Sequence, residues 1–417
     1  KKAISCALVA AMSVGLAACG TTSYDFKVSY DGIKTGDVSS KVSVHDPSIL
    51  KADGEYYIFG SHMSAAKSSD LLNWEKVADG YSKKNPVYGQ IYDVADEAFA
   101  YSGSKNSLIK TDDKQVHVWA PDVIYNETTG LYYMYYCTTS TWNASNLCYG
   151  TSTTPEGPYE WQGALIYSGF NRKTISGTDV LDYVDEDYAY KNYIKGAQYN
   201  YEDYPNAIDP TVFYDADGRM WMVYGSWSGG IFLLEIDKTT GLVIHPEADK
   251  ANNVDPYYGK RLLGGGHISI EGPYIMYDET SGYYYLFVSY GALTSNGGYQ
   301  VRVFRSKTVD GEYVDMNGKY PEKSAQHQNF GLKLTGNYKL PSLEKAYMAT
   351  GHNSAFVDDD GRMYLVYHTR FNDNGEGHSP RVHQMLVNED GWPCELPYQT
   401  QGETVNKDGY DTDDIIG

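Results

Sequence analysis

The chain has 417 residues, enough for one large β domain or for two smaller domains with cores of their own. Its 42 tyrosines and 42 glycines favour strands and tight turns over helices. The formal net charge of -20 argues against a nucleic-acid partner, which requires a basic face, and is compatible with a neutral ligand.

The first residues have the layout of a secretory signal. Two lysines precede the apolar, small-residue run "AISCALVAAMSVGLAA", and Cys19 follows at once. The segment Leu16 to Cys19 resembles the lipobox of bacterial lipoproteins, in which the cysteine is lipidated; a plain signal peptide is the alternative. We therefore predict a lipoprotein signal peptide over 1–18, a lipidated Cys19 with its tether over 19–40, and an extracytoplasmic protein anchored to the membrane or cell surface.

Three cysteines lie beyond this leader. Cys137 and Cys148 flank the segment "TTSTWNASNL" and are expected on adjacent strands of one hairpin. Both a disulfide and two buried thiols fit this placement. Cys394 has no evident partner.

Five stretches share one template. They are "HDPSILKADGEYYIFGS", "APDVIYNETTGLYYMYYC", "IDPTVFYDADGRMWMVYGS", "IEGPYIMYDETSGYYYLFVSY" and "GHNSAFVDDDGRMYLVYHT". Each reads as a polar side chain, a short strand, a turn containing glycine and a second, strongly apolar strand. Five repeated antiparallel sheets predict an all-β fold, a five-bladed β-propeller over 41–401, whereas a β-sandwich would not explain five hairpins that begin alike. Residues 402–417 are either a tail or the start of a further C-terminal region.

Each repeat carries a polar side chain where its first strand begins. Because the first strand of each propeller blade lines the central channel, these side chains are expected to converge near one end of the axis. Carboxylates held close together should raise the pKa of at least one of them. Such a ring fits a carboxylate pair that hydrolyses a glycoside, carboxylates and a histidine that bind a divalent cation, or both. The five residues are Asp46, Asp122, Asp209, Glu271 and His352.

The motifs "HDPS", "IDPTVFYD", "IEGPYI" and "GHNS", in this order and together with "WAPDVIY" and "RVHQMLVNEDGWP", resemble those of glycoside hydrolase family 43. The strongest resemblance is to the endo-α-1,5-L-arabinanases of that family. It implies a monomeric, inverting glycoside hydrolase that cleaves internal α-1,5-L-arabinofuranosyl links of arabinan. An exo-acting arabinofuranosidase or β-xylosidase of the same family is one alternative. A non-catalytic glycan-binding surface lipoprotein is the alternative from another class.

The resemblance also implies a role for each repeat residue. Asp46 would be the general base that deprotonates the attacking water, and Glu271 the general acid that protonates the leaving oxygen. Asp209 would orient Glu271 and raise its pKa. His352 would contact a calcium ion that is coordinated largely by water. The family pattern gives Asp122 no acid or base role, so a structural, hydrogen-bonded carboxylate is expected there.

Other residues are predicted to contact the substrate from the same rim. Trp119 and Trp227 are candidates to stack on sugar rings. Polar contacts are expected from His45, Asn206, His267, Ser269 and Arg381.

Overall fold

The computed structural model describes residues 40–112, 114–141, 143–321, 327–340, 345–371, 377–397 and 399. The predicted signal peptide, Cys19 and the tail over 402–417 lie outside these residues. Within the described part of the chain, no helix has the length and apolar character needed to cross a bilayer.

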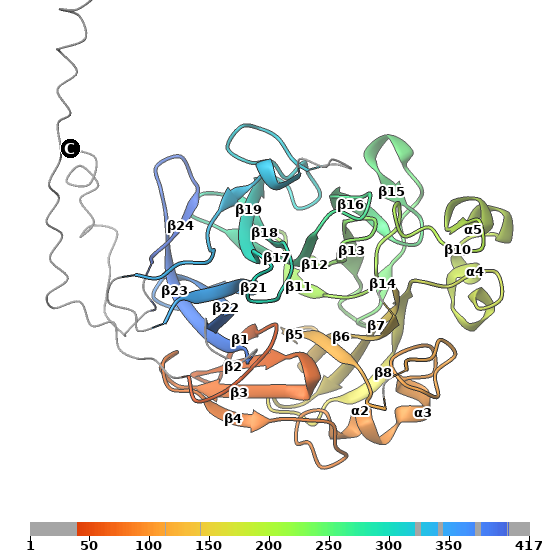
Figure 1. Cartoon of the computed structure of the whole chain (residues 1–417), viewed down its shortest axis with the longest axis horizontal. Helices are drawn as coiled ribbons and strands as arrows, with labels where there is room; N and C mark the ends of the chain where they lie inside the picture. Colours follow the sequence, from red (N-terminus) through yellow and green to blue (C-terminus); the bar gives the residue numbers. More distant parts are fainter. Residues whose placement is uncertain are drawn as a thin grey trace, which may run out of the picture. The chain divides into compact units, whose positions relative to one another are not determined.

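Five antiparallel sheets follow one another along the chain (Figure 1), and the strands of each come from one continuous segment. Blade 1 contains β1 (Ser48–Ala52), β2 (Glu55–Gly60), β3 (Ser64–Ser68) and β4 (Glu75–Ala78). Blade 2 contains β5 (Val118–Asn126), β6 (Leu131–Thr141), β7 (Ala144–Ser152) and β8 (Glu160–Tyr167). Blade 3 contains β11 (Thr211–Tyr214), β12 (Met220–Tyr224), β13 (Ile231–Ile236), β14 (Val243–Ile244), β15 (Val254–Asp255) and β16 (Gly259–Leu263).

The last two blades repeat the four-stranded pattern. Blade 4 contains β17 (Ile270–Asp278), β18 (Tyr283–Tyr290), β19 (Gln300–Ser306) and β20 (Leu332–Lys333). Blade 5 contains β21 (Tyr347–Val357), β22 (Met363–Phe371), β23 (Ser379–Val387) and β24 (Pro393–Glu395). The first hairpin turn of each blade has a glycine at positive φ, as the turn motifs predicted, and these are Gly54, Gly130, Gly218, Gly282 and Gly361.

The innermost strands close into a ring. Each of β1, β5, β11 and β17 contacts the innermost strand of the following blade, and β21 contacts β1. Ser354 joins the two ends of the ring, because its hydroxyl accepts a hydrogen bond from the Ile49 backbone N–H and donates one to the Pro47 carbonyl. This closure confirms the predicted five-bladed β-propeller.

The hydrophobic core lies between neighbouring blades rather than within one of them. Along a strand, successive side chains point to opposite faces of the sheet. In β6, Tyr133 and Tyr135 therefore pack toward blade 3, whereas Met134 and Tyr136 pack toward blade 1. The tyrosine-rich second strands thus supply the packing between blades, and they leave the inner strand starts available for polar residues.

The same alternation decides the state of the two hairpin cysteines. In the ladder between β6 and β7, Cys148 lies opposite Tyr136, and Cys137 lies opposite Leu147. The two thiols are offset by one residue and point to opposite faces, so Cys137 packs between blades 2 and 3 and Cys148 between blades 1 and 2. Both are free and buried, and the disulfide that the spacing allowed does not form. Cys394 is also a free thiol.

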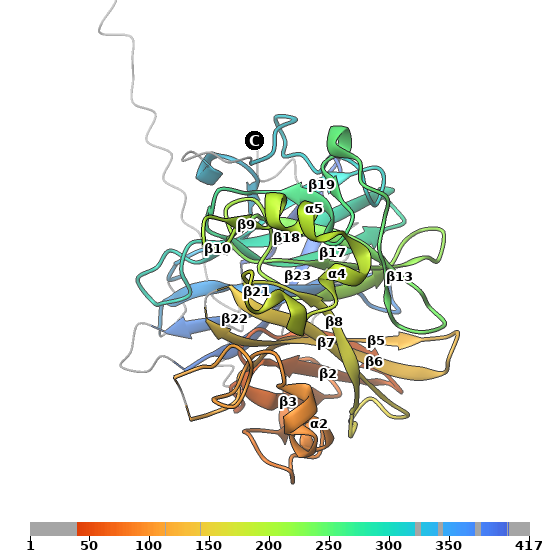
Figure 2. The same ribbon diagram turned by 90° about the vertical axis from the view of Figure 1, so that its right-hand side faces the viewer.

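Two insertions add short helices to the outside of the propeller. The second one, seen from the side in Figure 2, packs its apolar residues on the cluster between blades 2 and 3. The first insertion carries α2 (Gly89–Asp93) and α3 (Ala95–Ala98). The second carries η2 (Ile175–Gly177), α4 (Val180–Tyr183), α5 (Glu186–Asn192), β9 (Ile194–Lys195) and β10 (Gln198–Tyr199). The other short turns are η1 (Ser61–Met63), η3 (Lys250–Asn252) and η4 (His327–Asn329).

Candidate active site

A residue with positive φ interrupts the inner strand of every blade, just before β1 and β11 and inside β5, β17 and β21. Two residues later the regular pairing with the second strand begins or resumes, at Ser48, Asp122, Thr211, Tyr274 and Ser354. In blades 1 to 4 the residue after the positive φ is proline, which has no N–H to give to the ladder. The strand therefore opens on an irregular residue whose side chain leaves the sheet, and such strain is common at functional sites. The five residues are Asp46, Ala120, Asp209, Gly272 and His352.

This geometry corrects the alignment of the repeats. Asp46, Asp209 and His352 are equivalent, as predicted. Glu271 precedes its equivalent position, Gly272, by one residue, and Asp122 lies two residues farther along the channel, at the position of Ser48 and Thr211. The one-letter patterns concealed this shift, because a bulge changes the register without changing the turn that follows.

Asp46 is surrounded by hydrogen-bond donors and imidazole rings. Its Oδ2 accepts a hydrogen bond of 2.5 Å from the Ser61 hydroxyl. Its Oδ1 lies 3.1 Å from Nδ1 of His352, 3.1 Å from Nε2 of His45 and 3.7 Å from Nδ1 of His368. Asp46 itself is 8% exposed, so these contacts act with little screening by solvent.

These neighbours decide the charge of Asp46. Burial alone would raise the pKa of its carboxyl, but His352, His45, His368 and the Ser61 hydroxyl outweigh burial and hold the pKa well below the usual range. Burial disfavours the charged form of His352, yet Asp46, Asp209 and Glu271 together raise its pKa above the ordinary value. At neutral pH Asp46 is therefore ionised and can accept a proton from water.

Glu271 has a different set of partners. Its Oε2 accepts hydrogen bonds from the Trp227 indole N–H at 2.8 Å and from the Ser226 hydroxyl at 3.2 Å. Its Oε1 lies 2.8 Å from the Tyr299 hydroxyl. Burial, reinforced by the negative charge of Asp46, raises the pKa of Glu271 despite the opposing effects of these donors and of His352. This side chain can therefore hold the proton that a general acid needs.

Asp209 is bonded to the strand that carries Glu271. Its Oδ2 accepts a hydrogen bond of 3.2 Å from the backbone N–H of Gly272, the residue that follows Glu271. Burial, reinforced by the charges of Glu271 and Asp46 and opposed by that of His352, raises the pKa of Asp209 to about 7. The predicted orienting role thus has a concrete contact, because Asp209 holds the backbone that carries Glu271.

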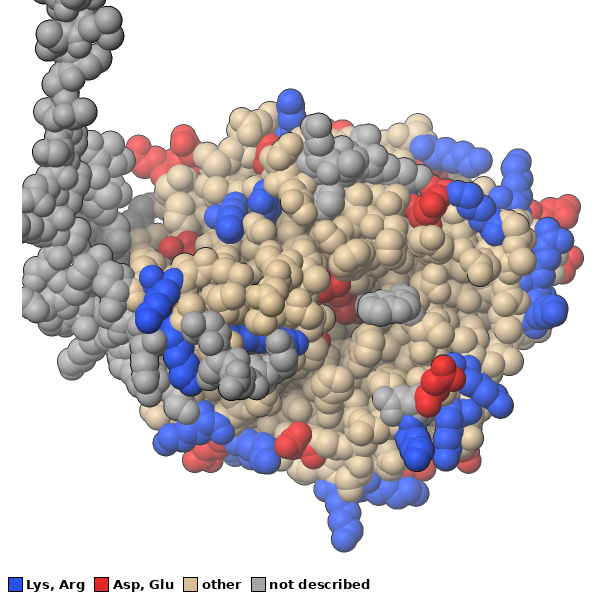
Figure 3. Space-filling view, in the orientation of Figure 1, with Lys and Arg blue, Asp and Glu red and all other residues tan. Residues whose placement is uncertain are grey.

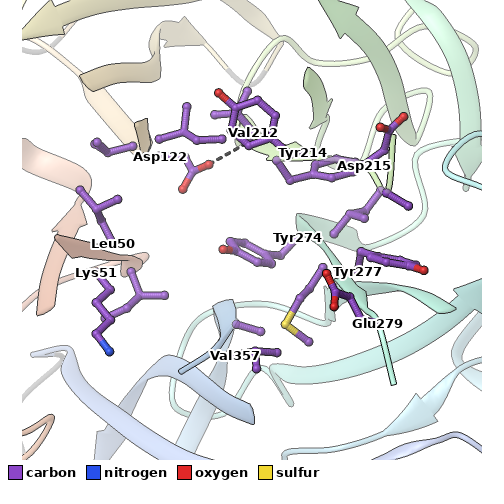
Figure 4. A pocket seen from close by; sticks show the side chains of 18 residues that line it. Leu50, Lys51, Asp122, Val212, Tyr214, Asp215, Tyr274, Tyr277, Glu279 and Val357 are labelled. Atoms are coloured by element: carbon purple, nitrogen blue, oxygen red, sulfur yellow. Dashed lines mark hydrogen bonds between the residues drawn. The ribbon is translucent and has the colours of Figure 1, made fainter. Parts of the chain in front are cut away.

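Asp122 does not belong to this cluster. Its carboxylate accepts hydrogen bonds from the Ser48 hydroxyl and from the Val212 backbone N–H, so it connects the inner strands of blades 1, 2 and 3. Burial raises its pKa to about 7. It lines a cavity of about 850 Å³ among the later residues of the five inner strands, shown in Figure 4, where Asp122 and Tyr274 point inward. The structure agrees with the structural role expected for Asp122.

Asp46, Asp209 and Glu271 do not line that cavity. In the face shown in Figure 3, the surface is hollowed near its centre, with acidic atoms inside the hollow and most lysine and arginine side chains toward the edge. Such a surface admits an uncharged polymer without attracting polyanions.

The predicted substrate contacts have different outcomes. Trp227 reaches the cluster, but its indole N–H is bound to Glu271. His267 is exposed and lies beside Trp227, with 5.4 Å between the ring centroids. Ser269 is half-buried two residues before Glu271, and Trp119 is half-buried against His117.

Two further predicted contacts make bonds within the protein. Asn206 is buried and accepts a hydrogen bond from Ser168. Arg381 is buried over the rings of Tyr347 and Phe371, and it donates to the Pro380 carbonyl on its own strand. The motif "RVHQM" that contains Arg381 therefore supports blade 5 from within.

A group of three histidines adjoins Asp46. Ligand nitrogens of His45, His368 and His378 all lie within 4.8 Å of one another. The His45 and His378 rings stack with 3.8 Å between centroids. Burial lowers the pKa of His45 to about 4 and that of His378 to about 3, so both rings are neutral at pH 7. Three neutral imidazoles form a donor set that a cation can use.

Most of the residues missed by the motif analysis follow the second strand of a blade. Ser61 follows β2, Ser226 follows β12, and His368 lies near the end of β22, opposite Gly351 in the ladder. Tyr299 directly precedes β19. In an antiparallel hairpin the end of the second strand lies beside the start of the first, and this rule is the signal that could have found them.

Comparison with known proteins agrees with this site. The family model "Glycosyl hydrolases family 43" matches residues 38–204 and 185–393. The chain is 39% identical over 387 residues to an extracellular endo-α-(1→5)-L-arabinanase of Thermotoga petrophila, covering 90% of this chain and 74% of the relative. It is 37% identical over 396 residues to extracellular endo-α-(1→5)-L-arabinanase 2 of Bacillus subtilis, covering 89% and 74%.

Solved structures lead to the same family. The crystal structure of endo-1,5-α-L-arabinanase from Thermotoga petrophila matches with a TM-score of 0.72 and 39% identity over 87% of this chain and 76% of that one. An exo-1,5-α-L-arabinanase from a bovine ruminal metagenomic library matches with a TM-score of 0.59 and 27% identity over 85% and 97%. The closed five-bladed ring, the paired carboxylates at its inner strand starts and these matches together place the chain in glycoside hydrolase family 43.

Proposed function

We propose that the chain hydrolyses arabinan from within, cleaving internal α-1,5-L-arabinofuranosyl links with inversion at the anomeric carbon. The observation that carries the proposal is the pair Asp46 and Glu271. Asp46 is buried and Glu271 half-buried, yet the pKa of one is lowered and that of the other raised, which is the division of charge that acid–base hydrolysis of a glycoside requires.

In the proposed reaction, Asp46 accepts a proton from a water molecule, and that water attacks the anomeric carbon. Glu271 donates its proton to the glycosidic oxygen as the bond to the leaving sugar breaks. Asp209 keeps Glu271 in place through the Gly272 N–H. Inversion requires room for the water between acid and base, so we expect their carboxyl groups about 6.5–9.5 Å apart.

Identity to the named relatives favours internal over terminal cleavage. Two endo-acting relatives are 37–39% identical, whereas an extracellular exo-α-(1→5)-L-arabinofuranosidase of Cellvibrio japonicus is 27% identical over 369 residues, as is a third endo-acting relative, endo-α-(1→5)-L-arabinanase 1 of Bacillus subtilis, over 379 residues. A glycan-binding protein without catalysis would not need all three acidic residues, and here Asp46, Asp209 and Glu271 are all present.

Product analysis tests the proposal. Purified protein is incubated with linear, debranched arabinan, and new reducing ends and product lengths are followed over time. We expect mixed oligosaccharides early in the reaction. Release of arabinose alone would instead identify an exo-acting enzyme, and binding without any new reducing ends would identify a glycan-binding protein.

A cation beside Asp46 is part of the proposal. The resemblance implies calcium, which prefers oxygen ligands, whereas His45, His368 and His378 offer imidazole nitrogens, which fit zinc or nickel better. Nδ1 of His352 faces Asp46, so this ring is also an ion-pair partner of the base. The histidines present thus do not build a calcium shell by themselves, and water would supply most ligands of a calcium ion. Metal analysis of the purified protein, and melting curves after chelation and addition of calcium or zinc, identify the ion.

We also propose that lipid at Cys19 holds the enzyme on the outside of the cell. The proposal rests on the lipobox-like sequence and on the relatives, whose names call them extracellular. A Cys19→Ala variant should lose incorporation of labelled fatty acid and appear in the medium. An unchanged membrane fraction would show that this cysteine is not the anchor.

A further inference from the structure

The two oxygens of the Glu271 carboxyl have chemically different partners. Oε2 receives the indole N–H of Trp227 and the hydroxyl of Ser226, and Oε1 faces the hydroxyl of Tyr299. An indole N–H can donate a hydrogen bond but cannot accept one, whereas a phenol hydroxyl can do either. The two sides of the carboxyl are therefore not interchangeable.

Both partners are held in place by the fold. Trp227 and Ser228 have positive φ values of 47° and 31°, and the backbone N–H of Trp227 donates to the carbonyl of Ile270, the residue before Glu271. This strained turn fixes the indole relative to the acid.

The Tyr299 ring is equally constrained. It is 1% exposed and lies parallel to the His368 ring, with 6.0 Å between centroids. Gly351 makes this position possible, because a Cβ there would come within 2.4 Å of the Tyr299 ring. The ring cannot swing away during the reaction, but its hydroxyl hydrogen can rotate about the C–O bond.

We propose that Trp227 and Tyr299 act on different oxygens of Glu271. Trp227 keeps the acidic proton away from Oε2, so that the proton stays on Oε1. The Tyr299 hydroxyl accepts a hydrogen bond from that proton and, once the proton has left, donates one to Oε1 instead. The inference rests on the proposed hydrolysis and assigns two positioning residues within it. The indole N–H occupies Oε2 at 2.8 Å and cannot accept a proton, which leaves a proton on Oε2 only the Ser226 hydroxyl at 3.2 Å as acceptor. A proton on Oε1 has the Tyr299 hydroxyl at 2.8 Å, so the protonated acid carries it on Oε1.

The proposed step conserves protons and electrons. The proton on Oε1 passes to the glycosidic oxygen, the bond between that oxygen and the anomeric carbon breaks, and the oxygen keeps the electron pair. Water forms the new bond and gives its proton to Asp46. The Tyr299 O–H then turns to donate to the carboxylate left on Glu271, a charge-assisted hydrogen bond that is stronger than the neutral one it replaces.

Leaving-group chemistry tests this assignment. A nitrophenolate leaves without being protonated, whereas a sugar alkoxide requires an acid. We therefore compare a linear arabino-oligosaccharide with the 4-nitrophenyl glycoside of the same oligosaccharide, using wild type, Tyr299→Phe and Trp227→Phe. Tyr313→Phe is the matched control, because it removes one buried hydroxyl hydrogen bond, of 2.9 Å to the Val309 carbonyl, that does not involve Glu271.

On the oligosaccharide, both site variants should lose about 10- to 100-fold in kcat, with KM changed by less than about 2-fold. On the nitrophenyl glycoside they should stay within about 3-fold of wild type. Tyr313→Phe should match wild type on both substrates, and melting curves establish that each variant is folded.

Equal losses on both substrates, or no loss on either, would overturn the assignment for that residue. If Tyr299→Phe does not fold, Trp227→Phe tests the asymmetry of the carboxyl by itself. If the wild-type protein cleaves neither substrate, the proposed function is refuted. If the wild-type protein is active but the variants lose equal activity on both substrates, only the roles of Trp227 and Tyr299 are refuted.

Discussion

Replacing Ser61 by alanine should lower the rate of hydrolysis by affecting only Asp46, the proposed general base. Ser61 is 1% exposed, and its hydroxyl donates to Oδ2 of Asp46 at 2.5 Å while it accepts the Ala120 backbone N–H at 2.8 Å. Gly60 lets this serine approach, since a Cβ at residue 60 would lie 2.2 Å from the His45 carbonyl. One hydroxyl thus connects the catalytic carboxylate with the bulge of the next blade.

The size of the effect follows from these two contacts. A hydrogen bond to a charged group contributes about 1.5–3 kcal/mol, which corresponds to about 10- to 100-fold in rate if it is needed to aim Asp46 at the water. The Ala120 N–H loses its partner as well, which should cost about 1–2 kcal/mol of folding stability. His352 and His45 remain beside Oδ1, so Asp46 should stay ionised in the variant. The lower kcat would then come from a misplaced carboxylate, not from a protonated one.

The assay measures kcat and KM of Ser61→Ala on linear arabinan and on the nitrophenyl glycoside. Because Asp46 deprotonates the attacking water whichever group leaves, the loss of kcat should be the same on both substrates. Ser102→Ala is the control, since it removes a buried hydroxyl that donates to the Thr138 carbonyl at 2.9 Å, away from Asp46. An activity of Ser61→Ala within about 2-fold of wild type, with the melting temperature lowered, would refute the catalytic part of the reasoning and leave only a structural contact.

Three further outcomes are expected. Asp46→Ala should abolish hydrolysis of both substrates, whereas Glu271→Gln should abolish hydrolysis of arabinan and spare part of the activity on the nitrophenyl glycoside; near wild-type activity on arabinan in either variant would contradict the roles assigned. Asp122→Asn should keep activity within about 3-fold, and Asp122→Ala should lower the free energy of unfolding by about 2–4 kcal/mol, as measured by denaturant titration, because Ser48 and Val212 lose their acceptor. Burial raises the pKa of Glu395 from 4.5 to about 8, beside His383, which burial keeps neutral with a pKa of about 4. The stability that this protonated carboxyl contributes is complete below pH 4.5 and falls as pH rises from 4.5 to 8, by up to about 5 kcal/mol, so the melting temperature should fall across that range and level off above pH 8 in wild type, and should stay level in Glu395→Gln.

The repeat pattern in the sequence predicted the fold, and it aligned two of the three acidic residues correctly. A turn glycine, a period-two apolar strand and a polar opening residue are local features, and each depends on a few neighbouring positions. Asp46 and Asp209 were therefore aligned correctly from the letters. Glu271 was displaced by one residue and Asp122 by two, because the exact residue at which a bulge occurs depends on pairing with a strand that the local pattern does not describe.

The partners of the carboxylates depended on contacts over long sequence distances. Tyr299 reaches Glu271 across 28 positions, and His368 reaches the Asp46 backbone across 322. Nothing in the sequence around Tyr299 distinguishes it from the many tyrosines that pack between blades. Trp227 was recognised as a rim residue, but the composition of its motif predicted stacking on sugar, whereas the fold directs its indole N–H to Glu271.

The two catalytic carboxyls show why these partners matter more than burial. Burial by itself raises the pKa of both Asp46 and Glu271. At Asp46 the imidazoles of His352, His45 and His368 and the Ser61 hydroxyl together overcome that effect, whereas at Glu271 the Tyr299 hydroxyl, His352 and the Trp227 indole oppose it without reversing it. The cluster of imidazoles around one carboxyl favours the base, and its absence around the other permits the acid. Exchanging the kind of neighbour, rather than the carboxylate, is therefore the change that should exchange the roles of the two sites.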